Sequence, residues 1–202
     1  MPPSPHDVID YWLGDAQTDP SAARDRSKLW YGSSTEVDNR IRHDFGDALI
    51  LAERQELQHW LESPSGQLAL VILLDQFSRN LNRGSKDAWE NDDQALDIAA
   101  NCVDKNDHLA LSYFGRVFLY HPFHHAESIA AQEKAVFLFD ELYNNAPSEW
   151  QPSLKGFADF TRSHSDIVRR FGRFPHRNEI LGRQSTPDED KYLKENSKKY
   201  GQ

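Results

Sequence analysis

The sequence predicts an all-α protein, and three observations support this prediction. Apolar residues recur at helical spacing through nearly all of the 202 residues, and strand-like alternation is scarce. Ser, Thr or Asp followed by proline, a typical helix start, occurs at several segment boundaries. No linker-like or low-complexity stretch divides the chain. We therefore expect a single all-α domain over residues 1–202, with about eight helices stacked as antiparallel pairs.

The first half of the chain contains four predicted helices. They start at Ser4-Pro5, at Asp19-Pro20, at Ser33 with Glu36 in a capping-box pattern, and at Ser63-Pro64. The first two should end near Gly14 and Gly32. The fourth reads GQLALVILLDQF and is apolar on all sides, so we expect it at the centre of the core.

The second half contains five further predicted helices. We expect them over residues 88–103, 107–120, 128–143 and 154–171, and from a Thr186–Glu189 capping box to about Lys199. Pro122 should end or kink the helix over 107–120, because proline lacks an N–H group and clashes with the preceding turn. Gly172 should end the helix over 154–171.

Composition excludes several classes of protein. The net charge of −9 argues against general nucleic-acid binding, which relies on an excess of Lys and Arg. No apolar run approaches the roughly 20 residues that span a bilayer, and the first residues do not resemble a signal peptide. Cys102 is the only cysteine, so no internal disulfide forms. We expect a cytoplasmic protein that uses neither a membrane nor a nucleic acid.

The first polar cluster ends the apolar helix and reads Asp75-Gln76-Phe77-Ser78-Arg79-Asn80. Asp75 and Arg79 are four residues apart, so they share one face of a helix, and burying them is costly unless they pair. Two interpretations stay open. The cluster is either a structural ion pair with Asn80 capping the helix, or one part of a ligand site.

The second cluster, Tyr120-His121-Pro122-Phe123-His124-His125-Ala126-Glu127, holds three histidines and a carboxylate. Imidazole and carboxylate together suit zinc or iron. The spacing matches no standard ligand pattern, however, and the proline interrupts the helix. We therefore favour hydrogen-bonded histidines, or one histidine that acts as an acid or base, over a metal site.

The third cluster, FGRFPHRNEILGR over residues 171–183, combines three arginines and a histidine with aromatic residues of buried character. Arginine recognises carboxylate and phosphate with two parallel hydrogen bonds. Six arginines over residues 162–183 face only Asp166 and Glu179, so a small anionic ligand is favoured here. The alternative is that Arg173 and Arg177 fix helix ends, or that these arginines pair with acidic residues, of which Asp75 and Glu127 are the first candidates.

These clusters form an ordered set of motifs: ILLDQFSRN (72–80) with Arg83-Gly84, YHPF (120–123) with His125 and Glu127, and FGRFPHRN (171–178) with Leu181-Gly182-Arg183. In this set the chain resembles the bacterial family known as domain of unknown function family 924, over nearly its whole length. The resemblance implies a tetratricopeptide-like all-α fold and no established activity. Its motifs point to Asp75, Gln76, Arg79, Asn80, Arg83, His125, Glu127, Arg173, His176, Arg177 and Asn178.

Three functional hypotheses follow. In the first, the clusters meet in an interhelical pocket that binds a small carboxylate- or phosphate-bearing metabolite, with possible acid–base work by a histidine. The catalytic candidates are His125, Glu127 and His176, and the ligand-binding candidates are Asp75, Gln76, Arg79, Asn80, Arg83, Arg116, Arg173, Arg177 and Asn178. The second hypothesis is a tetratricopeptide-like adaptor for a protein partner. The third is a metal-dependent hydrolase or lyase that uses the His/Glu cluster. No cofactor is predicted, and the sequence leaves the oligomeric state open.

Overall fold

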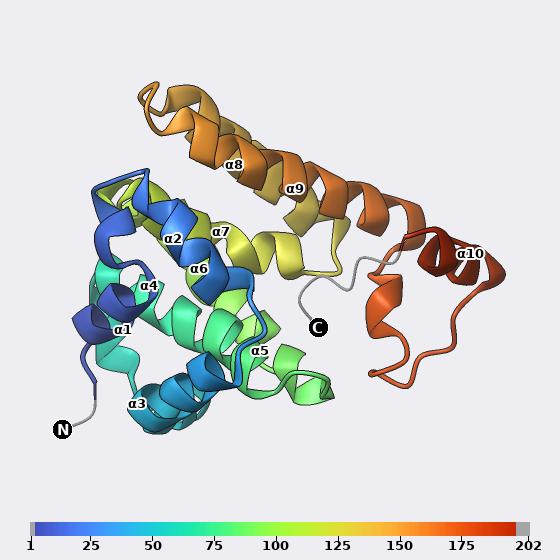
Figure 1. The fold of residues 1–202 in the computed structure, drawn as a ribbon, viewed down its shortest axis with the longest axis horizontal. Coiled ribbons are helices and arrows are strands. Elements are labelled where there is room, and N and C mark those ends of the chain that lie inside the picture. Colours follow the sequence, from blue (N-terminus) through green and yellow to red (C-terminus); the bar gives the residue numbers. More distant parts are fainter. Residues whose placement is uncertain (1–2, 197–202) are drawn as a thin grey trace.

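The computed structural model describes residues 3–196, and all the regular structure within that range is helical (Figure 1). The α-helices are α1 (Pro5–Trp12), α2 (Ala22–Tyr31), α3 (Thr35–Glu53), α4 (Pro64–Val71), α5 (Ser78–Leu81), α6 (Asp92–Asp104), α7 (Tyr113–His125), α8 (Ile129–Asn145), α9 (Gln151–Phe171) and α10 (Pro187–Glu195). Five short 3₁₀ segments lie between them: η1 (Gly14–Gln17), η2 (Gln58–Glu62), η4 (Lys86–Trp89), η5 (Asp107–Ala110) and η6 (Pro175–Arg177). The all-α prediction is confirmed, whereas the tetratricopeptide-like detail stays a prediction.

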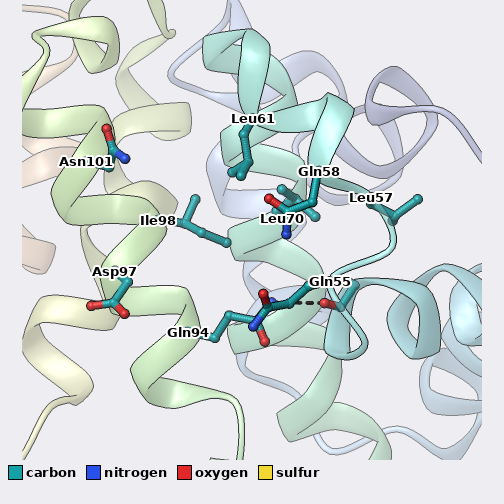
Figure 2. A pocket seen from close by; sticks show the side chains of 10 residues that line it. Gln55, Leu57, Gln58, Leu61, Leu70, Gln94, Asp97, Ile98 and Asn101 are labelled. Atoms are coloured by element: carbon teal, nitrogen blue, oxygen red, sulfur yellow. Dashed lines mark hydrogen bonds between the residues drawn. The ribbon is translucent and has the colours of Figure 1, made fainter.

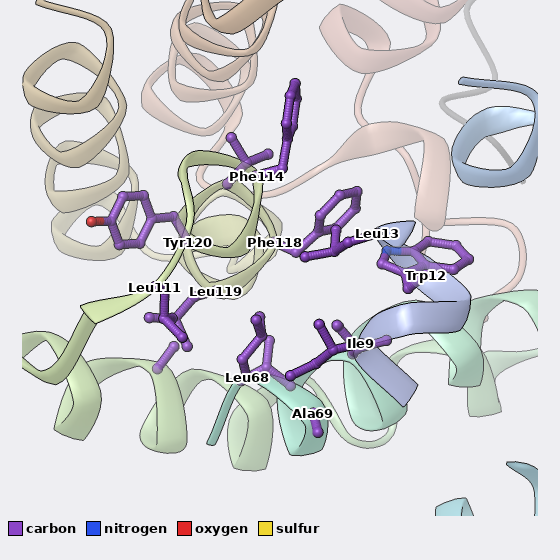
Figure 3. Close-up of a cluster of buried hydrophobic side chains, with 14 of the residues drawn as sticks. Ile9, Trp12, Leu13, Leu68, Ala69, Leu111, Phe114, Phe118, Leu119 and Tyr120 are labelled. Atoms are coloured by element: carbon purple, nitrogen blue, oxygen red, sulfur yellow. The ribbon is translucent and has the colours of Figure 1, made fainter. Parts of the chain in front are cut away.

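The core forms where α1, α4 and α7 meet. Ile9 and Trp12 of α1, and Leu13 directly after it, approach Leu68 of α4 and Phe118 of α7 (Figure 3). Each of these side chains is at most 5% exposed. Full burial of such a side chain contributes about 1.5–3 kcal/mol, so this cluster supplies much of the stabilisation. The apolar helix therefore occupies the central position that its sequence predicts.

Local capping explains most of the helix starts. Ser4 and Thr186 each form a complete capping box, and Ser63 accepts a hydrogen bond from the Gly66 N–H group. The predicted start at Ser33 is wrong by one residue. Ser34 is the cap of α3, and its hydroxyl accepts the Val37 N–H at 3.3 Å.

The predictions around α7 need two corrections. The helix expected over 107–120 is two elements, because Leu111 and Ser112 adopt extended conformations between η5 and α7, and Ser112 then caps α7. Pro122 does not end α7, which continues to His125. The missing N–H group of Pro122 removes one bond near the end of the helix, but its carbonyl still accepts the Ala126 N–H at 3.1 Å. Proline is tolerated there because the last turn is buried against neighbouring helices.

After α7 the chain forms a long antiparallel hairpin of α8 and α9, followed by a segment that folds back (Figure 1). Gly172 ends α9 with φ of +72°, a conformation that glycine adopts without a steric penalty. Residues 172–196 then carry η6 and α10. The predicted helix end near Lys199 lies outside the described residues. Within the described range, no helix has both the length and the apolar character of a membrane span.

Candidate functional site

A π-helical turn supports the candidate site from behind. After α4 the helix widens over η3 (Ile72–Phe77), and this turn carries Asp75, whose side chain is completely buried. Single π-helical turns occur frequently at functional sites. The Asp75 carboxylate lies 2.6 Å from His125 Nδ1, 2.5 Å from Gln76 Nε2 and 3.1 Å from the Arg79 guanidinium. A buried carboxylate is thus held by three donors from two parts of the chain.

The contact with Asp75 determines the protonation state and the tautomer of His125. Burial opposes ionisation of Asp75, but the hydrogen bond from His125 and the positive charge of Arg79 hold the pKa of its carboxyl below the usual range. Burial lowers the pKa of His125 well below its ordinary value, although Asp75 opposes this shift. We assign a neutral imidazole whose Nδ1–H donates to Asp75. No described residue forms a hydrogen bond with His125 Nε2, so this atom can accept one.

A second layer of charged residues surrounds this pair. Arg79 donates to the Ala88 carbonyl and to Asp92, each at 2.8 Å. Arg177 donates to the His125 carbonyl at 3.0 Å and lies 3.5 Å from the other Asp92 oxygen. Burial lowers the pKa of Arg177 to about 10, which leaves it charged at neutral pH. Asp92 therefore joins the two arginines to one another.

The third motif is attached to the end of α7 through Glu127. The Glu127 carboxylate accepts the Phe174 N–H at 2.7 Å and pairs with the Arg183 guanidinium, with one oxygen at 2.8 Å. Arg183 also donates to the Phe174 carbonyl at 3.2 Å. Arg177 lies over the Phe174 ring at 4.7 Å and the Trp89 ring at 5.3 Å. The three motifs therefore meet, as the first hypothesis requires.

Beside this network lies an open cleft of about 510 Å³. One wall comes from η4 and the start of α6, and the opposite wall comes from the end of α7, η6 and Leu181. The lining side chains combine charged groups with a few apolar ones: Lys86, Asp87, Trp89, Glu90, Asp92, Asp93, Leu96, His125, Ala126, Glu127, Ser128, Arg177 and Leu181. The volume lies within the range of small-molecule sites, which are commonly about 300–1,000 Å³.

Only some of the predicted site residues reach this cleft. His125, Glu127 and Arg177 line it. Asp75, Gln76 and Arg79 lie behind His125 as the network that supports it. The prediction that Asp75 and Glu127 pair with the arginines of residues 171–183 is correct for one pair, Glu127 with Arg183.

The remaining predicted residues have structural partners elsewhere. Asn80 and Arg83 contact Asp38 of α3, and Arg116 donates to the carbonyl groups of Leu109 and Leu111. Within the third motif, Arg173 pairs with Glu189, Asn178 contacts Ser185 and Arg183, and His176 is half-buried. These residues hold helices and the C-terminal segment in place.

Sequence reasoning missed the residues of the opposite wall. Trp89 and Asp92 belong to the stretch that we interpreted only as the start of a helix. Their signal was weak: an aromatic and an acidic residue follow Arg83-Gly84, but Asp75 and Glu127 already stood as partners for the arginines.

The geometry does not support a metal site. Among the described residues, no group of three or more His, Cys, Asp or Glu side chains is arranged to hold a metal ion. The His124 and His164 rings are stacked, with centroids 5.0 Å apart and planes only 15° apart, which does not direct both rings at one ion. The metal-dependent alternative therefore has no geometric support.

A second, smaller groove of about 240 Å³ lies between η2 and α6. Figure 2 shows the side-chain amides of Gln55, Gln58 and Gln94 around its apolar floor. Gln94 Nε2 already donates to the Ala52 carbonyl at 2.9 Å. The groove contains no histidine and is separate from the three motifs, so we treat the larger cleft as the candidate site.

Comparison with known proteins places the chain in a family. Residues 8–197 match the family described as bacterial protein of unknown function (DUF924). The chain belongs to this family. The chain is also similar to a solved structure, that of a protein of unknown function from Agrobacterium tumefaciens. That protein is 38% identical, with a TM-score of 0.79, and the match covers 95% of this chain and 97% of the other. No curated protein matches the chain.

Proposed function

We propose that this DUF924 protein binds a small polar molecule in the cleft, and that His125 exchanges a proton with it. The observation that carries the proposal is the 2.6 Å contact between His125 Nδ1 and the buried Asp75, at a cleft that His125 itself lines. A carboxylate on Nδ1 fixes the tautomer and orientation of an imidazole, and Nε2 is then available as a proton acceptor. Arg177 adds a fixed positive charge next to His125.

The lining charges favour a neutral or cationic ligand over the anionic one that the sequence predicts. The anionic prediction depends on unpaired arginines, but Arg79, Arg173, Arg177 and Arg183 each contact a carboxylate. Five carboxylates line the cleft; Asp92 and Glu127 already pair with arginines, which leaves Asp87, Glu90 and Asp93 against the positive charge of Lys86. A carboxylate or phosphate ligand in the cleft would therefore be repelled by more charged groups than would attract it. Neither the adaptor nor the metal-dependent alternative has an observation of this kind in its favour.

A screen by thermal shift tests the proposal, because a ligand that binds only the folded protein raises Tm. The panel contains matched amines, neutral amides and alcohols, carboxylates and phosphates. We expect hits among the neutral and cationic compounds, and we expect His125→Gln to abolish their effect. His43→Gln is the matched control, because the His43 side chain is 87% exposed on α3, outside the cleft lining. Hits that His125→Gln leaves unchanged would contradict the assigned role of His125.

A further inference from the structure

A chain of histidines connects the cleft with the C-terminal segment through the protein interior. His121, His124 and His125 come from α7, His164 comes from α9 and His176 from η6. The ring centroid of His124 lies 4.4 Å from that of His125, 4.7 Å from that of His121 and 5.0 Å from that of His164. His121, His124 and His164 are at most 5% exposed. The rings therefore pack as core side chains although each carries a titratable group.

The segment after α9 covers one end of this chain. Phe174 is completely buried, and its ring centroid lies 5.2 Å from that of His164 and 5.5 Å from that of His176. If residues 172–183 moved away from α7 and α9, water would reach both histidines. The same movement would remove Arg177 and Leu181 from the wall of the cleft.

The charged groups around these two histidines come from several elements. His164 faces His121 and His124 of α7, and His176 and Arg177 of η6. His176 faces Arg177, Glu127, Arg183 and Arg79. Most of these neighbours are cations or potential cations, so they add to the cost of a proton at either ring while the segment is closed.

The segment has only a small apolar attachment to the rest of the protein. Its apolar attachment is a small cluster of Ile167, Val168 and Phe174, with Phe171 and Tyr192 beside it, and this cluster is distinct from the main core. Local unfolding takes place most readily where few buried apolar contacts hold an element. Polar contacts complete the attachment, above all the bonds from Phe174 N–H and Arg183 to Glu127.

We propose that residues 172–183 form a flap that acid opens, because opening brings His164 and His176 into water where both take up protons. The inference concerns the protein without a ligand, so it stands or falls separately from the proposed function of the cleft. If the cleft does bind a small molecule, the open flap removes one of its walls and releases the ligand.

The size of the response follows from the difference between the closed and open states. Burial lowers the pKa of His164 to about 3 and that of His176 to about 4, whereas a solvated histidine has a pKa of roughly 6.5. Between pH 7 and pH 5.5, each histidine then raises the ratio of open to closed protein about 8-fold. The two together give an increase of about 70-fold.

Hydrogen exchange followed by mass spectrometry measures this ratio. Rates are compared at pH 7.0 and 5.5 after correction for the intrinsic pH dependence of exchange. The Phe174 N–H, bonded to Glu127, reports the closed flap directly. We expect protection in residues 172–183 to fall about 70-fold, and to stay well below that of α4 at both pH values because the flap opens without global unfolding. Unchanged protection in 172–183, or protection there equal to that of α4 at both pH values, would overturn the proposal.

Two variants test the assignment to these histidines. His164→Phe keeps an aromatic ring in place and removes one titrating group, so the response should drop to about 8-fold. His176→Phe should have the same effect and serves if the first variant does not fold. His43→Gln, exposed on α3, is the control and should keep the full response. A full response in both Phe variants would show that other groups drive the opening.

Discussion

Replacing Asp75 with Asn tests the buried network that supports the candidate site. The substitution keeps the shape of the side chain and removes its charge. Asp75 is completely buried and contacts three donors, His125, Gln76 and Arg79. Removing one partner of a buried ion pair costs about 3–5 kcal/mol. Arg79 keeps its second partner, Asp92, so we expect a loss near the lower end, about 3 kcal/mol.

Urea denaturation measures this loss as a lower midpoint at unchanged slope. Asp159→Asn is the matched control, since Asp159 is 51% exposed and pairs with Lys155 and Arg162 on the surface. Such exposed pairs contribute about 0–1 kcal/mol. If Asp75→Asn cost no more than Asp159→Asn, the network would not be the stabilising element that its geometry indicates.

Three further predictions concern stability. Burial lowers the pKa of His124 and His164, so the unfolded chain binds more protons below about pH 6.5 and stability is lost on acidification. Urea unfolding at pH 7 and pH 5 should differ by about 2 kcal/mol from His164, whose pKa burial lowers to about 3, and His124 acts in the same direction. Glu127→Gln weakens the pairing with Arg183 and should lower the free energy of unfolding by about 1–3 kcal/mol in the same assay. A loss below about 0.5 kcal/mol would contradict the role of Glu127 in attaching residues 172–183 to the end of α7. Gly172→Ala should cost about 1–2 kcal/mol from backbone strain alone, because φ is +72° and no atom lies within 4 Å of an added Cβ; an unchanged Tm would refute the strain.

The helices could be predicted from the sequence largely because their start signals are local. Ser63-Pro64 and Thr186-Pro187 satisfy their caps within three or four residues, so no distant contact is needed to interpret them. Pro122 shows where this reasoning fails. Its local effect is to remove one hydrogen bond, but burial of the last turn of α7 outweighs that loss.

The site was predictable only as three motifs, since the contacts between them are set by tertiary packing. His125 and Asp75 are fifty positions apart in the chain, and nothing local indicates that their side chains touch. Asp92 was missed for the same reason, because its two arginines approach from different helices. Pairing of the arginines with carboxylates also explains why a basic stretch of sequence does not produce a basic cleft.

A map of ligand contacts by NMR tests the central claim most directly. Imidazole and backbone resonances are recorded for the folded protein while the amine, amide and alcohol compounds that raise Tm are titrated in. We predict that shifts concentrate at His125, Glu127 and Arg177 and on the facing wall at Trp89, with the His125 ring neutral and Nδ1-protonated before addition. Shifts confined to the amide-lined groove around Gln94, or a charged His125 at neutral pH, would contradict the account.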